Sequence, residues 1–134
     1  MSSLLARGNA IIQVTGVDFS ASQGLAVKFA AGVPAVNDSA TVPAAAVVLD
    51  GNAAGKPTSV GILGALPGPV YLKLSAATAA VKQGDRLQQA ADGTFTKSLG
   101  AGNARVDVAV GTAPNGGVAG DLVEAATLAP MIGA

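Results

Sequence analysis

The sequence predicts an all-β protein, or a β-rich one with at most one short helix, folded as a compact antiparallel barrel or sandwich with an extended N-terminal arm. Three features predict this fold. A Gly-Asp step opens an apolar run at residues 84–85 and again at 120–121, residues 91–96 resemble a hairpin, and valines alternate with other residues over 105–110. Glycine supplies turn dihedrals, aspartate bonds its own backbone in turns, and alternation gives a strand one apolar face.

Length and composition favour a single domain with a core of small side chains. We expect residues 1–10 to form an arm and residues 11–134 to form one β-rich domain. Apolar residues make up 50% of the chain, but aromatic residues only 3%, and eighteen residues are glycine. Because burial energy scales with apolar area, a core of alanine and valine gains less per residue. We therefore expect burial between subunits to supplement it.

The first part of the chain predicts two strands followed by a loop. Residues 11–15 form a short apolar run typical of a strand. Residues 25–29 alternate, with Lys28 on the polar face. The apolar face of that strand is expected to hold Leu25, Val27 and Phe29. Residues 32–43 are rich in Gly, Pro, Asn, Asp and Ser, which predicts a surface loop.

The middle of the chain contains two open alternatives and two expected strands. Residues 44–49 are either a buried strand or one turn of helix, and residues 76–81 are either a helical turn or an extended connector. Residues 60–64 indicate a strand interrupted by glycine, which is typical of a bulge or a close backbone approach. Residues 70–74 predict a strand with Val70, Leu72 and Leu74 on one face and Tyr71 and Lys73 on the other. We interpret the two Gly-Asp steps as recurring turn chemistry rather than as an internal repeat.

Charge and hydropathy exclude two classes of partner. Eight basic and eight acidic residues give a formal net charge of zero, and neither sign forms a run. Nucleic-acid binding needs a concentrated basic surface, so we expect no nucleic-acid partner, and an anionic membrane is disfavoured for the same reason. The longest dense apolar stretch, residues 43–49, is far shorter than the ~20 residues that span a bilayer. The N-terminus lacks a signal-peptide pattern, so synthesis without secretion is expected.

Catalytic and metal-binding patterns are weak throughout the chain. It contains no cysteine and no histidine, which removes the usual general base and the thiolate ligands. Residues 51–56 differ from a phosphate-binding loop in spacing and are followed by Pro57 in place of Ser or Thr, and residues 100–105 lack the third glycine of a dinucleotide fingerprint. Four aspartates adjoin glycine, as turn residues do: Asp50, Asp85, Asp92 and Asp121. We expect no enzyme activity, no cofactor and no metal site.

Four segments occur in a characteristic order in the second part of the chain. They are V-K-Q-G-D-R-L at 81–87, A-D-G-T-F at 91–95, V-A-V-G-T-A at 108–113 and G-D-L-V-E-A at 120–125. In order and spacing they resemble the capsid cement, or head decoration, proteins of tailed bacteriophages, over about residues 60–130. Ala125 stands where a larger β-former is expected in that family, and residues 1–59 carry less of its pattern.

The resemblance implies a structural virion protein that binds the outer surface of an assembled phage head and stabilises the capsid lattice. It implies the major capsid protein as a partner, self-association as a homotrimer, and synthesis in the host cytoplasm. An N-terminal arm reaches onto the shell in some such proteins, which makes Leu4, Leu5 and Arg7 candidate contacts with the capsid. Tyr71 points away from the predicted core face and is a candidate subunit contact, because tyrosine is enriched at interfaces.

Three alternatives stay open at this level. The first is a head-fibre or receptor-binding accessory module that displays loops such as residues 32–43 to the host surface, although those residues hold no aromatic anchor. The second is an enzyme that uses lysine and aspartate, which a pocket with a strongly perturbed lysine would indicate. The third is a barrel similar to biotin or lipoyl carriers, but Lys56 and Lys97 lack the flanking methionines typical of that family.

Overall fold

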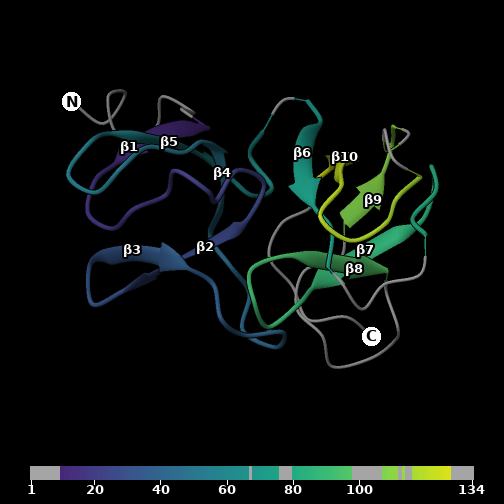
Figure 1. The fold of residues 1–134 in the computed structure, drawn as a ribbon, viewed down its shortest axis with the longest axis horizontal. Coiled ribbons are helices and arrows are strands. Elements are labelled where there is room, and N and C mark those ends of the chain that lie inside the picture. Colours follow the sequence, from purple (N-terminus) through teal and green to yellow (C-terminus); the bar gives the residue numbers. More distant parts are fainter. Residues whose placement is uncertain are drawn as a thin grey trace.

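The computed structural model describes residues 10–66, 68–75, 80–97, 107–111, 113 and 116–127, which form ten strands and no helix. The strands make two five-stranded antiparallel sheets that lie beside each other, in a sandwich-like arrangement that is not closed into a barrel (Figure 1). The all-β prediction is therefore confirmed. Sheet A contains β1 (Ile11–Val14), β2 (Ala26–Ala30), β3 (Val33–Val36), β4 (Ala46–Asp50) and β5 (Thr58–Ile62). Sheet B contains β6 (Val70–Lys73), β7 (Arg86–Gln89), β8 (Phe95–Lys97), β9 (Asp107–Ala109) and β10 (Leu122–Ala126).

The two sheets have the same strand order. Sheet A runs β1-β5-β4-β2-β3 and sheet B runs β6-β10-β9-β7-β8, so each strand of sheet A has a counterpart in sheet B. The registers also correspond. Val27 pairs with Ala46 where Leu87 pairs with Asp107, and Val48 pairs with Val60 where Ala109 pairs with Ala125. We call residues 10–66 half 1 and residues 68–127 half 2.

Single hydrogen bonds repeat as well. The amide of Gly24 donates to the Val48 carbonyl at 2.9 Å, and the amide of Gly84 donates to the Ala109 carbonyl at 2.7 Å. The β-bulge also recurs, because Asp50 pairs with Ser59 after a register shift and the amides of Val110 and Gly111 both donate to Glu124. The chain is therefore an internal structural duplication, which the sequence did not reveal. The two Gly-Asp steps both lie in half 2 and, as expected, are not copies of each other.

The core has two parts. One cluster lies inside half 1 around the fully buried Phe19, together with Val27, Ala46, Val48 and Val60. The other spans both halves and contains Ala26, Val47 and Leu63 of half 1 with Leu72, Leu87, Phe95 and Val123 of half 2, among others. Since the second cluster draws side chains from both sheets, the two halves are held by a shared apolar contact.

Most strand predictions are confirmed. Residues 11–15, 60–64 and 70–74 contribute β1, β5 and β6. The alternative at residues 44–49 resolves to the buried strand β4, whereas residues 76–79 lie outside the described part of the chain. Gly61 marks a close approach, as expected, since a Cβ there would stand 2.9 Å from the Leu66 side chain.

Three details of the prediction are wrong. The expected loop at residues 32–43 contains β3, which forms a hairpin with β2 through Gly32, whose φ is 80°. Phe29 is exposed because burial in β2 changes along the strand rather than between its two faces: Ala26 and Val27 at its start are buried, and its last two residues are exposed. In β9, Asp107 and Ala109 face inward while Val110 is exposed, since this strand must match the register of β7 and β10.

Candidate interaction surfaces

Tyr71 is the only predicted contact residue within the described part of the chain. Leu4, Leu5 and Arg7 lie outside it, in residues 1–9. Tyr71 belongs to β6 and is 49% exposed, and its hydroxyl donates to Oε1 of Glu124 on β10 at 3.1 Å. The hydrogen bond to the Glu124 carboxylate raises the pKa of Tyr71, with a smaller contribution from the charge of that carboxylate. The exposed position predicted for Tyr71 is therefore confirmed.

Tyr71 lines a hollow at the seam between the two halves. This hollow has a volume of about 200 Å³, and its walls are Gln23, Val48 and Leu49 of half 1 and Pro69, Val70 and Tyr71 of half 2. A second hollow of about 240 Å³ continues along the seam and includes Gln23, Lys73 and Leu122. Both are smaller than the ~300–1,000 Å³ typical of small-molecule sites. Their small size therefore argues against a substrate site.

The seam itself is held by backbone contacts at two glycines. The amide of Lys73 donates to the Gly24 carbonyl at 3.0 Å, and the amide of Ala26 donates to the Gly93 carbonyl at 2.8 Å. A Cβ on Gly24 would lie 2.9 Å from the Lys73 nitrogen, and one on Gly93 would lie 2.5 Å from the Val36 side chain. Both positions also have a positive φ, so glycine is required there for two reasons.

Gln89 adds a buried polar link across the seam. Its side-chain oxygen accepts from the amide of Ala44 at 2.8 Å, and its nitrogen donates to the carbonyls of Val42 at 2.9 Å and Ser39 at 3.1 Å. The loop after β3 therefore packs onto the β7–β8 hairpin. No local pattern in the sequence indicates this role, because glutamine on a hairpin is ordinarily exposed.

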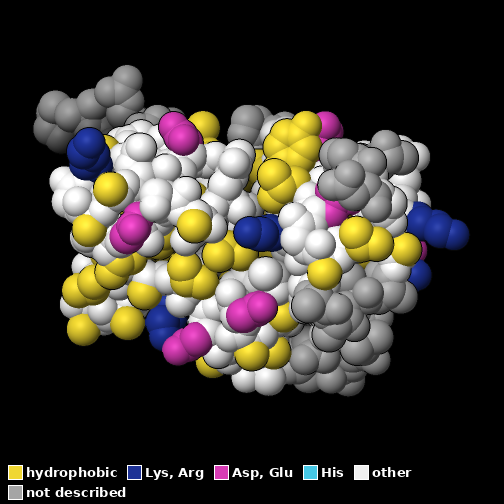
Figure 2. All heavy atoms as spheres, in the orientation of Figure 1, with side chains coloured by type: hydrophobic (Ala, Val, Ile, Leu, Met, Phe, Trp, Pro, Cys, Tyr) yellow, Lys and Arg dark blue, Asp and Glu magenta, His cyan; other side chains and the backbone are white. Residues whose placement is uncertain are grey.

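Exposed apolar side chains gather at the outer end of half 1. Phe29 is 42% exposed and Val33 is 51% exposed on the β2–β3 hairpin, and Ala30 and Ala31 between them are exposed too. Figure 2 shows hydrophobic side chains grouped at the lower left of the molecule, where this hairpin lies. We call these four residues the hairpin patch. Such a patch marks a contact surface more often than an isolated apolar residue does.

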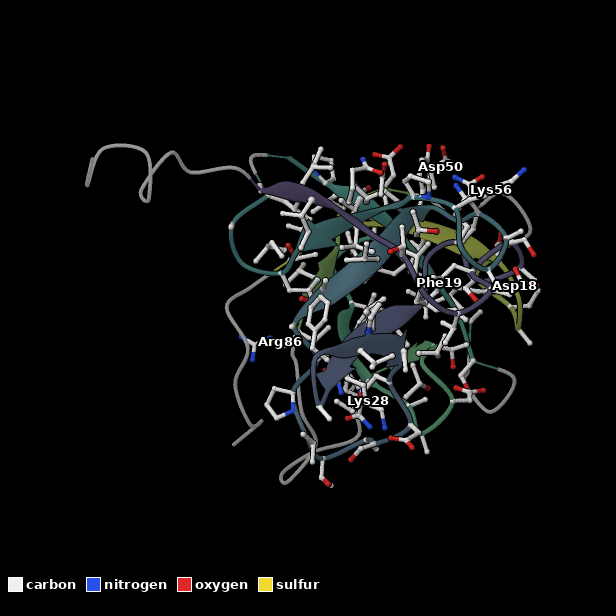
Figure 3. All side chains as sticks on the ribbon, turned by 90° about the vertical axis from the view of Figure 1, so that its left-hand side faces the viewer. Asp18, Phe19, Lys28, Asp50, Lys56 and Arg86 are labelled. Carbon is white, nitrogen blue, oxygen red and sulfur yellow. The ribbon has the colours of Figure 1, made fainter. Side chains whose placement is uncertain are left out.

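The acidic residues serve turns and pairs with lysine. Asp85 accepts from the Lys82 amide, Asp92 from the Thr94 amide, and Asp121 from the amides of Gly117 and Leu122, which confirms the predicted turn role of these three. The fourth, Asp50, is instead the last residue of β4 and pairs with Ser59 of β5, because the strand continues through the bulge. In Figure 3, Asp50 and Lys56 lie near one rim of half 1 and Lys28 lies near the opposite end. The described residues contain no group of three potential metal ligands.

Comparisons with family models, with curated proteins and with solved structures each find no match. Within the described ranges, no helix has the length and apolar character to cross a bilayer.

Proposed function

We propose that this chain is a non-enzymatic virion protein that decorates the outside of an assembled phage head, binds its major capsid protein and stabilises the lattice as a homotrimer. The observation that supports it most is the distribution of exposed apolar side chains. Eight large ones are exposed among the described residues, and most lie on edge strands, hairpins and turns. Apolar groups on outward-facing elements suit docking onto another protein surface.

The mechanism is multivalent binding. A trimer that touches several capsid subunits forms its later contacts at high effective concentration, which raises retention by about 10²–10⁴ over a single contact. A ligand that binds only the intact lattice stabilises that lattice by mass action. The zero net charge of the chain is compatible with close packing on a shell, since like copies repel little.

The N-terminal residues and the seam supply the candidate contacts. Leu4 and Leu5 beside Arg7 combine an apolar pair with a residue type enriched at interfaces. Tyr71 adds an aromatic ring at the mouth of the seam hollow. We assign the N-terminal residues to the capsid and Tyr71 to either a capsid or a subunit contact.

Co-sedimentation with undecorated, expanded heads of the phage that carries the gene tests the function. The full chain is expected to pellet with the heads and to raise the temperature at which they release DNA. A variant without residues 1–9 keeps Ala10, whose carbonyl accepts from the Ile62 amide at 2.7 Å, and so preserves the described fold. Failure of the full chain to pellet would refute the decoration role, and full retention of the shortened chain would refute only the arm contact.

A further inference from the structure

We propose that half 2 of one copy binds half 1 of a second copy, head to tail, by repeating the contact that joins the two halves within one chain. This contact supplies the subunit interface for the homotrimer in the proposed function, but it rests on the geometry of the chain alone. A second copy of this chain is therefore the partner for the hairpin patch.

The seam between the halves is one-sided. Half 1 contributes the start of β2, Leu49 and the loop after β3, and half 2 contributes β6 and the β7–β8 hairpin. In a two-fold arrangement Gly84, the counterpart of Gly24, would be covered by half 1 in the same way that Gly24 is covered by half 2. Instead no atom of the described residues lies within 4 Å of a Cβ built on Gly84, while one built on Gly24 would stand 2.9 Å from the Lys73 nitrogen. Because the contact is heterologous, each half uses only one of its two equivalent surfaces within the chain. One surface on half 1 and one on half 2 are therefore left unused.

The unused surface of half 1 corresponds to the part of half 2 that is buried in the seam. By strand register Gly32 is the counterpart of Gly93, and Ile11 is the counterpart of Pro69. A Cβ on Gly93 would stand 2.5 Å from the Val36 side chain, but within the described part of the chain no atom lies within 4 Å of a Cβ on Gly32. Ile11 is 54% exposed. Pro69 is itself exposed at the rim of the seam hollow, so the halves differ in burial at the glycine: Gly93 is buried in the seam, whereas Gly32 is exposed.

The unused surface of half 2 corresponds to the part of half 1 that is buried in the seam. Val110 is the counterpart of Leu49, and Gly84 is the counterpart of Gly24. Val110 is 36% exposed, although Leu49 is partly buried and packs against the shared core. This free surface therefore carries one exposed apolar side chain and is open at its glycine.

The two free surfaces complement each other. Leu49 and Pro69 line the same hollow within the chain, so their counterparts Val110 and Ile11 would meet between copies as two exposed apolar side chains. β1 is an outer strand of sheet A, as β6 is of sheet B, and by register Thr15 is the counterpart of Lys73. The Thr15 amide of half 1 therefore has the position that the Lys73 amide, which donates to Gly24, has in half 2. Between copies, Thr15 then donates to the Gly84 carbonyl.

At two equivalent positions the halves carry different residues, and these differences give the proposed contact between copies the composition of a subunit interface. Phe29 stands where half 2 has the buried Gln89, and Arg86 stands where half 1 has the buried Ala26. Aromatic residues and arginine are enriched at interfaces, and an arginine stem covers apolar surface while its head group stays in water. A head-to-tail contact forms a ring when its rotation closes. A closed ring of three copies contains two halves per copy, hence six equivalent units.

Sedimentation velocity over a range of concentrations tests the contact. The wild-type chain is expected to sediment above its monomer mass of 12.8 kDa, as a closed species. Val33→Asp places a charge in the hairpin patch and should weaken association by about tenfold to a hundredfold. Val118→Asp is the matched control, because Val33 is 51% and Val118 is 50% exposed but Val118 lies outside both surfaces. It should associate like the wild type.

Thiol cross-linking tests the head-to-tail orientation of the two copies. The chain contains no cysteine, so only the introduced thiols can react. A short bis-maleimide should link Ile11→Cys to Val110→Cys when the two single variants are mixed. Neither variant should link to itself, and Ile11→Cys should not link to Val118→Cys. Monomeric sedimentation of the wild type at every concentration would overturn the proposal. Equal effects of Val33→Asp and Val118→Asp on association would also overturn it. Self-linking of Ile11→Cys would overturn it as well, because it indicates either a two-fold contact between copies or binding of one copy's N-terminal residues to the other. Since no capsid is present, none of these outcomes bears on head binding.

Discussion

Half 1 and half 2 share strand order, register and a bulge, yet equivalent positions carry different chemistry. Gly24 and Gly84 both hold a positive φ before β2 and β7, and Gln23 and Gln83 precede them. Little else in these turns is common to both halves. The comparison teaches that turn geometry and strand pairing define this repeated unit, while the side chains around it are free to adapt to what covers each surface.

The two hairpins show that adaptation most clearly. The loop after β3, which belongs to half 1, covers the β7–β8 hairpin of half 2, and Gln89 of that hairpin satisfies three backbone groups of the loop. In half 1 the corresponding position is Phe29, which stays 42% exposed. A buried polar group needs fixed partners, whereas an apolar ring can accept a separate protein surface. The difference matches an inner contact in one half and an outer contact in the other.

The largest expected difference between the halves is at the paired glycines. Gly24→Ala should lower the free energy of unfolding by about 3–4 kcal/mol, since it adds overpacking against Lys73 to the cost of a left-handed backbone. Gly84→Ala should cost only about 1–2 kcal/mol, the backbone term alone. Urea denaturation in the Val33→Asp background keeps the chains monomeric for the comparison. Equal losses would show that the two turns have the same surroundings.

The next difference is at the hairpin positions. Gln89→Ala leaves the Ala44 amide and two carbonyls without their partner and should cost about 2–3 kcal/mol. Phe29→Ala should change the free energy of unfolding by less than about 1 kcal/mol, because the ring is already exposed in a single copy. Thermal denaturation of both variants checks this. A larger loss at Phe29 would mean that its ring belongs to the core.

A smaller difference is expected on acidification. The backbone hydrogen bond from Lys82 lowers the pKa of Asp85, and Lys97 contributes further. A lowered folded-state pKa stabilises the turn above the unfolded value of about 3.9, and this contribution is lost as the pH falls below about 4. The protection factor of the Lys82 amide, which corrects its exchange rate for the intrinsic pH dependence, should therefore fall in that range and should not change there in Asp85→Asn. The counterpart in half 1 is Leu25, so the Ser22–Leu25 turn should not respond through this group.

The smallest effect concerns the equivalent edge-strand pairs. Gln13 donates to Ser59 at 2.8 Å where Tyr71 donates to Glu124 at 3.1 Å. Tyr71 is the only tyrosine, so its ionisation can be followed by ultraviolet absorbance. Its pKa should lie above 10 and move toward 10 in Glu124→Gln, while Ser59→Ala leaves it unchanged. An unchanged pKa in Glu124→Gln would show that the hydroxyl does not bond Glu124 in solution.

The sequence predicts the class of the fold because strand alternation and turn residues are local signals. Residues 70–74 and the aspartate turns illustrate this, since each depends on neighbours in the chain. The duplication leaves almost no such signal. Val27 and Leu87, or Ala46 and Asp107, occupy the same register with unrelated side chains.

The surfaces could be predicted only in part. Tyr71 is identifiable because it opposes Leu72 and Val70 in a clear alternation. Phe29 and Val110 are misassigned to the core, because alternation indicates two faces but not which contact covers each one. Gln89 and the paired glycines depend on contacts between segments far apart in the chain, which no local pattern contains.

Amide hydrogen exchange at Lys73 and Thr15 tests the central claim, that one head-to-tail contact is used inside the chain and left open at its ends. The Lys73 amide donates to Gly24 and should exchange slowly at all protein concentrations. The Thr15 amide should exchange rapidly in dilute wild-type protein, slow down as concentration rises, and stay rapid in Val33→Asp. Rapid exchange at Lys73, or exchange at Thr15 that ignores concentration, would contradict the account.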